Sequence, residues 1–289
     1  AKAGAHARST VLTQLELEHF SQKVNTVQCQ GCGNHCQLTV NVFADGKRFI
    51  SGNRCDKPVT GKANNEDLDL YAYKLKLLDG YRKAAAPANS RGKIGIPLCL
   101  NMYELLPFWH TLFSRLGFEV VVSPFSNRKL YQSGQATIPS DTACFPAKLA
   151  HGHVQWLVSQ GVKRIFHPCV FYERQERADA KNHFNCPMVV AYPENLKNNV
   201  EAVADGEVKY IRPFIAFTSL KTISDRLARF CRGEWDIPER ESRAAAALAW
   251  QEQLKAKEDI RREGARRLEE MEKRGGRGIV LAGRPYHID

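Results

Sequence analysis

A chain of 289 residues with 43% hydrophobic and 25% charged residues has the composition of a globular protein with a sizeable core. No run approaches the ~20 apolar residues that cross a bilayer, and the N-terminus lacks the apolar core of a signal peptide. The net charge of +11 is spread along the chain without a block of like charges, which favours a solvated basic surface over a nucleic-acid site. We therefore expect a cytoplasmic protein without a membrane partner. In that reducing compartment its nine cysteines favour metal binding over disulfides.

The ends of the chain predict that it is a fragment of a larger protein. It does not begin with Met, and it stops soon after an apolar run at residues 279–282 that is typical of a strand just begun. Composition predicts six segments: a polar N-terminal segment (1–28), a cysteine-rich metal module (29–60), a connector (61–92), an α/β domain (93–238), a long charged helix (239–276) and the start of a further strand or domain (277–289).

The N-terminal part predicts a short helix within residues 12–20 and a β-hairpin. Apolar runs at residues 38–43 and 48–50 flank Asp45-Gly46, and this dipeptide is a strong hairpin-turn signal. Cys36 and Cys55 would then lie at the two ends of the hairpin, where their side chains could converge on one ion.

Four cysteines within this segment have metal-ligand spacing: Cys29, Cys32, Cys36 and Cys55. Two thiolates separated by two residues can chelate one ion through a tight turn, and a small loop-rich unit needs such a staple. Four thiolates suit tetrahedral zinc and an iron–sulfur cluster equally, so the metal stays open. The alternative is a set of buried cysteines without a ligand.

From Lys93 onward the pattern predicts β-α-β units, and hence a parallel sheet covered by helices. Asn101 and Glu104 have the spacing of a helix capping box. The predicted elements, in chain order, are a strand at 94–99, a helix that follows Asn101 and ends at Gly117, and a strand at 118–122. A helix from 146 to 161, a strand ending at 169, a strand at 188–191 and a helix after Pro193 come next, and helices at 219–231 and 239–274 complete the series. No phosphate-binding loop is present, so we expect no ATP binding by this chain.

Cys144 and Cys169 form a second candidate site. Cys144-Phe145-Pro146 stands where a helix begins, and a helix N-terminus stabilises a thiolate. Cys169 is predicted at the carboxyl end of a strand, the edge where open α/β sheets bind ligands. The alternative interpretation is two ordinary core cysteines. We interpret Cys99 and Cys186 as structural.

The runs Thr137-Ile138-Pro139-Ser140-Asp141-Thr142-Ala143-Cys144-Phe145-Pro146-Ala147-Lys148 and His167-Pro168-Cys169-Val170-Phe171-Tyr172-Glu173 resemble the activase-related proteins of the 2-hydroxyacyl-CoA dehydratase system. The segments at 29–36 and 52–55 do so too. The part resembled is the dehydratase-like domain that follows the ATPase domains. Dehydratase-type subunits hold [4Fe-4S] clusters through cysteines on separate loops, and the resemblance assigns two of these positions to Cys144 and Cys169. Cys231 matches the third position poorly, so the resemblance implies a third ligand beyond Asp289.

The resemblance implies an iron–sulfur electron-transfer or activator component that works with an ATPase domain of the same parent protein and with an acyl-CoA dehydratase. The parent would be an ATP-dependent reductive activator, and the fragment would not be active alone. The alternative function is a zinc-stapled, non-catalytic scaffold that docks the ATPase domain to its partner. A zinc-ribbon module for nucleic acid is the third interpretation and the least favoured.

Overall fold

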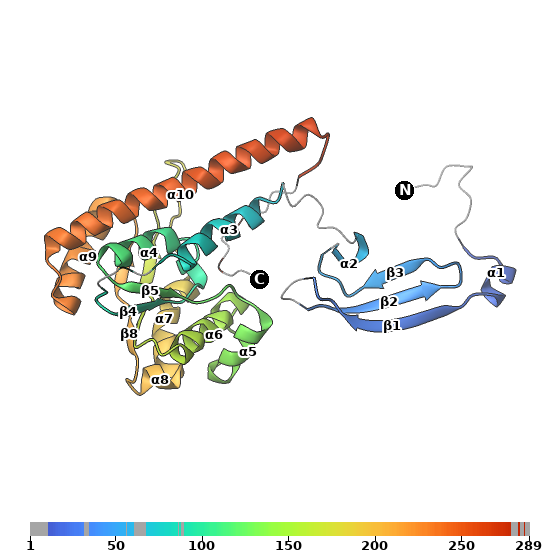
Figure 1. Cartoon of the computed structure of the whole chain (residues 1–289), viewed down its shortest axis with the longest axis horizontal. Coiled ribbons are helices and arrows are strands. Elements are labelled where there is room, and N and C mark those ends of the chain that lie inside the picture. The colour runs from blue at the N-terminus through green and yellow to red at the C-terminus, as the bar shows by residue number, and fades with distance from the viewer. Residues whose placement is uncertain are drawn as a thin grey trace. The chain divides into compact units, whose positions relative to one another are not determined.

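The computed structural model describes residues 11–31, 35–55, 57–60, 68–85, 87, 90–278, 283 and 286. The chain divides into two compact units, Ala1–Asn65 and Glu66–Asp289 (Figure 1). The first unit contains α1 (Gln14–Glu18), β1 (Gln22–Gln28), β2 (Gln37–Phe43), β3 (Arg48–Ser51) and α2 (Lys57–Thr60).

The first unit is a three-stranded antiparallel sheet in the order β1-β2-β3. The predicted hairpin is confirmed: β2 and β3 pair directly, and Gly46 adopts a φ of 79° in the turn, a conformation that glycine adopts without strain. Strand β1 was not predicted, because its polar sequence shows no apolar alternation and all seven of its residues are exposed. Its register with β2 shows that backbone pairing rather than burial defines this strand.

The second unit has a parallel sheet between two layers of helices. Its elements are α3 (Leu70–Arg82), β4 (Lys93–Ile96), the 3-10 helix η1 (Leu100–Met102), α4 (Leu106–Arg115), β5 (Glu119–Val122), α5 (Arg128–Gly134), the 3-10 helix η2 (Gln135–Thr137), α6 (Phe145–Ser159), β6 (Arg164–Phe166), β7 (Cys169–Tyr172), α7 (Pro187–Asn199), α8 (Glu201–Ala204), β8 (Lys209–Ile211), β9 (Phe214–Ala216), α9 (Leu220–Trp235) and α10 (Glu239–Lys273).

The main sheet has the strand order β5-β4-β6-β8, and every pair in it is parallel. Strands β7 and β9 continue from β6 and β8 as a second parallel pair. The amide N–H groups of His167 and Cys169 donate to the carbonyls of Ile211 and Pro213 at 2.8 and 3.0 Å. These two hydrogen bonds connect the β6–β8 pair to the β7–β9 pair. The predicted α/β fold with parallel strands is therefore confirmed.

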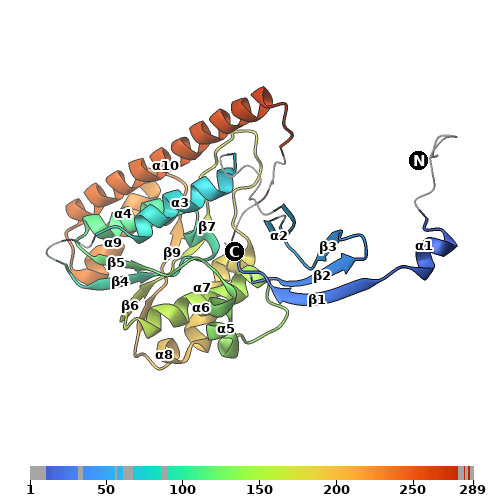
Figure 2. The same ribbon diagram turned by 45° about the vertical axis from the view of Figure 1, so that its right-hand side comes forward.

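Two cores lie on the two faces of the sheet. Helices α3, α4, α9 and α10 cover one face, and α5 to α8 cover the other (Figures 1 and 2). The first core is rich in aromatic residues, and Trp109, Phe113 and Phe166 are buried within it. The second core packs Val154 and Leu157 of α6 against Ile165 and Leu196.

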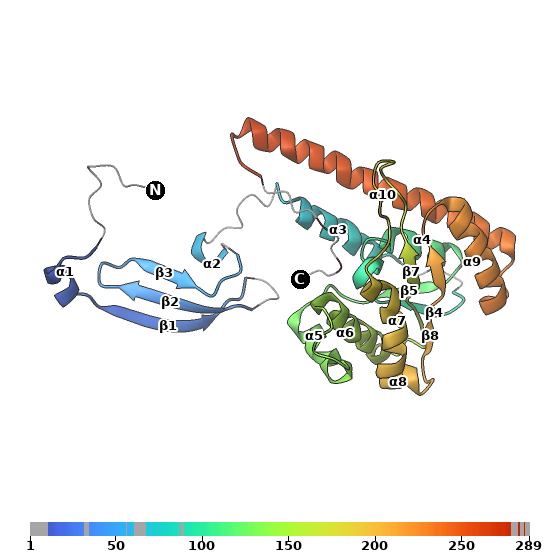
Figure 3. The same cartoon turned by 180° about the vertical axis from the view of Figure 1, so that it is seen from behind.

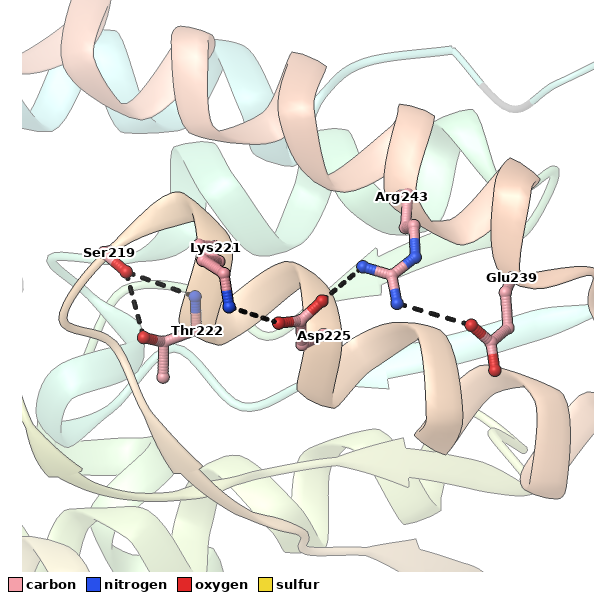
Figure 4. A network of polar contacts seen from close by, with 6 residues as sticks. All are labelled: Ser219, Lys221, Thr222, Asp225, Glu239 and Arg243. Atoms are coloured by element: carbon pink, nitrogen blue, oxygen red, sulfur yellow. Dashed lines mark hydrogen bonds and ion pairs between the residues drawn. The ribbon is translucent and has the colours of Figure 1, made fainter.

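The predicted long charged helix is confirmed as α10, and part of its surface is buried. Its first half is buried on α4 and α9 through Ala245, Ala246 and Ala249. Figure 3 shows from behind that the ribbon of α10 runs alongside those of α4 and α9. A polar network fastens α9 to α10: Asp225 accepts from Lys221 and Arg243, and Arg243 also contacts Glu239 (Figure 4).

The predicted capping box at Asn101 is wrong. Helix α4 begins five residues later, after a 3-10 turn, and Leu105 in its N-cap position has no side-chain hydrogen bond. Gln253 of α10 performs the capping instead: its Oε1 accepts from the N–H of Phe108 at 3.1 Å, and its Nε2 donates to the carbonyl of Glu104 at 2.9 Å. A tertiary contact has thus replaced the local cap.

The predicted strand at residues 188–191 is also wrong, because this segment lies in helix α7. Pro187 is its first residue, a position where proline stabilises a helix. Val189, Tyr192 and Leu196 are buried at helical spacing against the second core. The short apolar run could not distinguish a strand from a buried helix face.

Candidate functional site

The strand order reverses at β4, because β5 pairs with one side of β4 and β6 pairs with its other side. From β4 the chain runs through α4 to β5, and then through α5 and α6 to β6, which lies on the opposite side of β4. In open α/β sheets, ligands bind at such a switch point, outside the carboxyl ends of the strands. The switch point here lies between β4 and β6.

Cys144 lies at the start of α6. It is the N-cap residue, and its carbonyl accepts from the N–H groups of Ala147 and Lys148 at 3.0 and 3.1 Å. Its thiol makes no capping hydrogen bond, and the residue is exposed. The prediction that a helix starts at this cysteine agrees with the observed helix, since Phe145 and Pro146 are its first two residues.

Cys169 is buried where β6 continues into β7. The prediction placed it at the end of a strand, whereas it is the first residue of β7. The pKa of the Cys169 thiol is raised to about 12, mainly by burial and also by the nearby Glu194, while Arg212 has the opposite effect. Without a bound cation, this thiol is protonated at neutral pH.

Three histidines that the sequence did not single out lie buried near the same edge. His151 donates from Nδ1 to Thr137, whose hydroxyl donates to the carbonyl of Gly134. Its Nε2 therefore accepts from the hydroxyl of Tyr192, at 3.0 Å. Because burial lowers the pKa of His151 to about 4, this ring is neutral at pH 7.

His153 and His167 also have hydroxyl partners. His153 lies 2.7 Å from Ser123 Oγ and 3.0 Å from Ser126 Oγ, while Nδ1 of His167 lies 2.7 Å from the hydroxyl of Tyr210. Burial lowers the pKa of both rings to about 3. The only sequence signals were the His-Gly-His run in α6 and the histidine two residues before Cys169.

The tyrosines of this network lie within electrostatic range of three cysteines. The pKa of Tyr192 is raised to about 12, mainly by burial and also by Cys144 and Cys99. Burial also raises the pKa of Tyr210, with contributions from Cys99 and Cys169. Cys99 itself is buried in the second core, in agreement with its structural interpretation. In the part of the chain that the structure describes, no three His, Cys, Asp or Glu side chains are grouped so as to hold a metal ion.

Cys29, Cys36 and Cys55 lie at one end of the N-terminal sheet. The N–H of Cys29 donates to the carbonyl of Cys36 at 2.8 Å, one residue beyond the β1–β2 register. Cys55 follows β3, which leaves the sheet at the same end. Cys32 lies outside the described residues. The structure shows the hairpin here, but it does not show a metal module.

The model of one protein family, described as the CoA enzyme activase uncharacterised domain (DUF2229), matches residues 93–289. This match covers more than half of the chain. The chain belongs to this family. The comparisons with curated proteins and with solved structures each found no match.

The match to the CoA enzyme activase domain begins at the first residue of β4. It therefore contains Cys144 and Cys169, whereas the four N-terminal cysteines lie outside it. The predicted relationship to the activases is confirmed. No helix among the described residues is long and apolar enough to span a membrane.

Charged residues beside the candidate cysteines have partners within the fold. Nζ of Lys148 donates to the carbonyl of Asp141 at 2.7 Å, and Oε1 of Glu173 accepts from Nδ2 of Asn185 at 2.8 Å. Both side chains hold neighbouring loops in place, which is a structural role.

Proposed function

We propose that this CoA enzyme activase domain holds an iron–sulfur cluster through Cys144 and Cys169, as an electron-transfer or activator component related to 2-hydroxyacyl-CoA dehydratases. The observation that carries the proposal is the position of the two cysteines: one precedes the helix that leads into β6, and the other follows β6. Both therefore belong to the connections around the switch point. The family match supports the link to CoA enzymes.

The two thiols suit a cluster in complementary ways. Thiolates are the ligands that iron–sulfur clusters use. Cys144 is exposed at the start of α6, so its sulfur is accessible to a cluster. Cys169 has a raised pKa, and a metal cation bound to its sulfur would displace the proton. They supply part of a ligand set, and the remaining ligands are expected beyond the described residues.

The surroundings of Cys169 would keep water away from a cluster. Cys169, His167 and Val170 are fully buried. The neighbouring histidines are neutral and paired with hydroxyl groups, so they add polarity without charge. A bound cluster supplies one-electron transfer, and burial and hydrogen bonding are the means by which a protein adjusts its potential.

The partners follow from the same proposal. An ATPase domain of the parent protein would supply the electron, and an acyl-CoA dehydratase would receive it. The present chain would be one relay between them, so we expect it to show no dehydratase activation when tested alone.

For the N-terminal unit we propose a structural metal, with zinc as the alternative to a cluster, at Cys29, Cys32, Cys36 and Cys55. Leu38 is the single buried residue among those described in this unit. A sheet with so little core cannot offset the entropy of ordering its chain, and small units of this kind depend on a metal or on disulfides. If the protein is only a scaffold, this N-terminal site would be its metal site, and Cys144 and Cys169 would bind no cluster.

The test is metal analysis of serine variants prepared without oxygen. Cys144→Ser and Cys169→Ser are expected to lower the iron content, while Cys186→Ser is the matched control, because Cys186 is likewise an exposed N-cap residue, of α7. Equal iron in all three variants and the parent chain would contradict the cluster assignment. Zinc that disappears only with Cys29→Ser or Cys36→Ser would favour the scaffold function.

A further inference from the structure

Asn101 is a buried amide without a partner. Its side chain is 2% exposed, and neither Oδ1 nor Nδ2 has a hydrogen-bond partner within the described residues. Its backbone carbonyl is engaged, since it accepts from Leu105 at 3.1 Å. Buried polar groups in folded proteins are nearly always paired, so an amide with two unpaired groups calls for an explanation.

The position of Asn101 connects it to the ligand-binding edge of the sheet. It follows β4 at the switch point, directly after Leu100, which has a φ of 51°. That left-handed conformation is unfavourable for a branched residue, and backbone strain of this kind concentrates at functional sites. The N–H of Leu100 donates to the carbonyl of Tyr286 at 2.9 Å. Both polar atoms of the Asn101 side chain remain unpaired in this turn.

His167 provides a second unpaired group on the adjacent strand. It follows β6, is fully buried, and uses Nδ1 to contact Tyr210 at 2.7 Å. Its Nε2 has no partner in the described part of the chain. Asn101 and His167 thus stand in the loops that follow the two strands on either side of the switch point.

The charges near this edge balance one another. Arg212 and Glu194 are the charged side chains that act on Tyr210, the partner of His167, and they form an ion pair at 2.8 Å. An anion such as phosphate would find no uncompensated positive charge here, so the chemistry favours a neutral ligand.

We propose that Asn101 is the recognition residue of a binding site for a neutral ligand that presents an N–H donor beside an acceptor, as carboxamides and nucleobase edges do. An asparagine amide pairs with such an edge through two hydrogen bonds, with Nδ2 donating and Oδ1 accepting. Nε2 of His167 provides a further contact. This site is separate in its chemistry from the proposed cluster, since neither side chain is a thiolate.

The first experiment measures thermal stability without a ligand. Asn101→Leu replaces the unpaired amide with an apolar side chain and is expected to raise the Tm by a few degrees. The matched control is Asn185→Leu, because Asn185 is also buried but donates to Val170 and Glu173. This control is expected to lower the Tm. A comparable loss in Asn101→Leu would show that the amide has a structural partner, and would overturn the proposal.

The second experiment measures binding of nicotinamide and adenosine by ligand-observed NMR, with phosphate and acetate as anionic controls. Saturable binding of nicotinamide or adenosine, at least ten-fold weaker in Asn101→Leu, is the expected result. Preference for nicotinamide would identify a carboxamide ligand, and preference for adenosine a base edge. Failure of both probes to bind the parent chain, or tighter binding of the anions, would overturn the proposal.

Discussion

Gly152 of α6 lies against the backbone of Leu130 in α5, so closely that a Cβ added at Gly152 would stand 2.1 Å from the Leu130 carbonyl oxygen. Gly134 makes the reciprocal contact, since a Cβ there would lie 2.2 Å from the backbone nitrogen of Gly152. The crossing of these two helices therefore needs glycine on both sides. Because Cys144 is the N-cap residue of α6, the same crossing constrains the backbone from which its side chain projects.

We predict that Gly152→Ala lowers the free energy of unfolding by about 1–3 kcal/mol, since the helices must separate to admit the methyl group. Gly233→Ala is the matched control in α9, where an added Cβ meets no atom within 4 Å. There the higher helix propensity of alanine is expected to stabilise the protein slightly. Urea denaturation followed by circular dichroism measures both. A neutral effect at Gly152 would show that the helices do not cross this closely.

Gln253 is predicted to stabilise α4 from a distance of 145 residues along the chain. Gln253→Ala removes both hydrogen bonds and leaves the N–H of Phe108 unpaired in the core, at an expected cost of about 1–3 kcal/mol. Gln251→Ala on the exposed side of the same helix should leave stability nearly unchanged. Equal denaturation midpoints for the two variants would contradict the capping role.

The buried histidines predict that stability falls in acid. His151 has a folded-state pKa of about 4, below the usual 6.5. Between these values the unfolded chain binds a proton that the folded chain does not, so stability declines as the pH drops from 6.5 towards 4. The slope is up to about 1.4 kcal/mol per pH unit for one histidine. His151→Gln should make the curve shallower over this interval, and an unchanged slope would show that His151 is not buried and neutral.

Metal removal is predicted to affect the N-terminal unit selectively. A chelator should expose residues within 1–65 to a protease while the α/β unit stays resistant, because only the latter has extensive cores. Mass spectrometry of the first cleavage products locates the cuts. Cuts distributed equally over both units, or resistance of both, would contradict a metal staple at the four N-terminal cysteines.

The sequence predicted those elements whose signals are local. The Asp45-Gly46 turn, the helix that starts after Cys144 and the long helix α10 were all predicted, because turn residues, proline and helical spacing act over a few positions. Strand β1 was missed, since pairing with β2 rather than burial defines it.

The failures arise from contacts distant in sequence. The cap at Asn101 fitted the local rule, but Gln253 occupies the N-terminus of α4 and leaves Asn101 unpaired. Of the candidate site, the sequence supplied the cysteines, whereas the histidine–hydroxyl pairs needed the fold. His151 and Tyr192 are 41 positions apart, and no local pattern brings them together.

The most direct test of the cluster assignment is the iron and sulfide content of the chain purified without oxygen, measured beside Cys144→Ser and Cys169→Ser. We predict iron and sulfide in the parent chain, with broad absorbance near ~400 nm typical of thiolate-ligated clusters, and a loss of both in each variant. A colourless parent chain without iron or sulfide would contradict the proposed electron-transfer function.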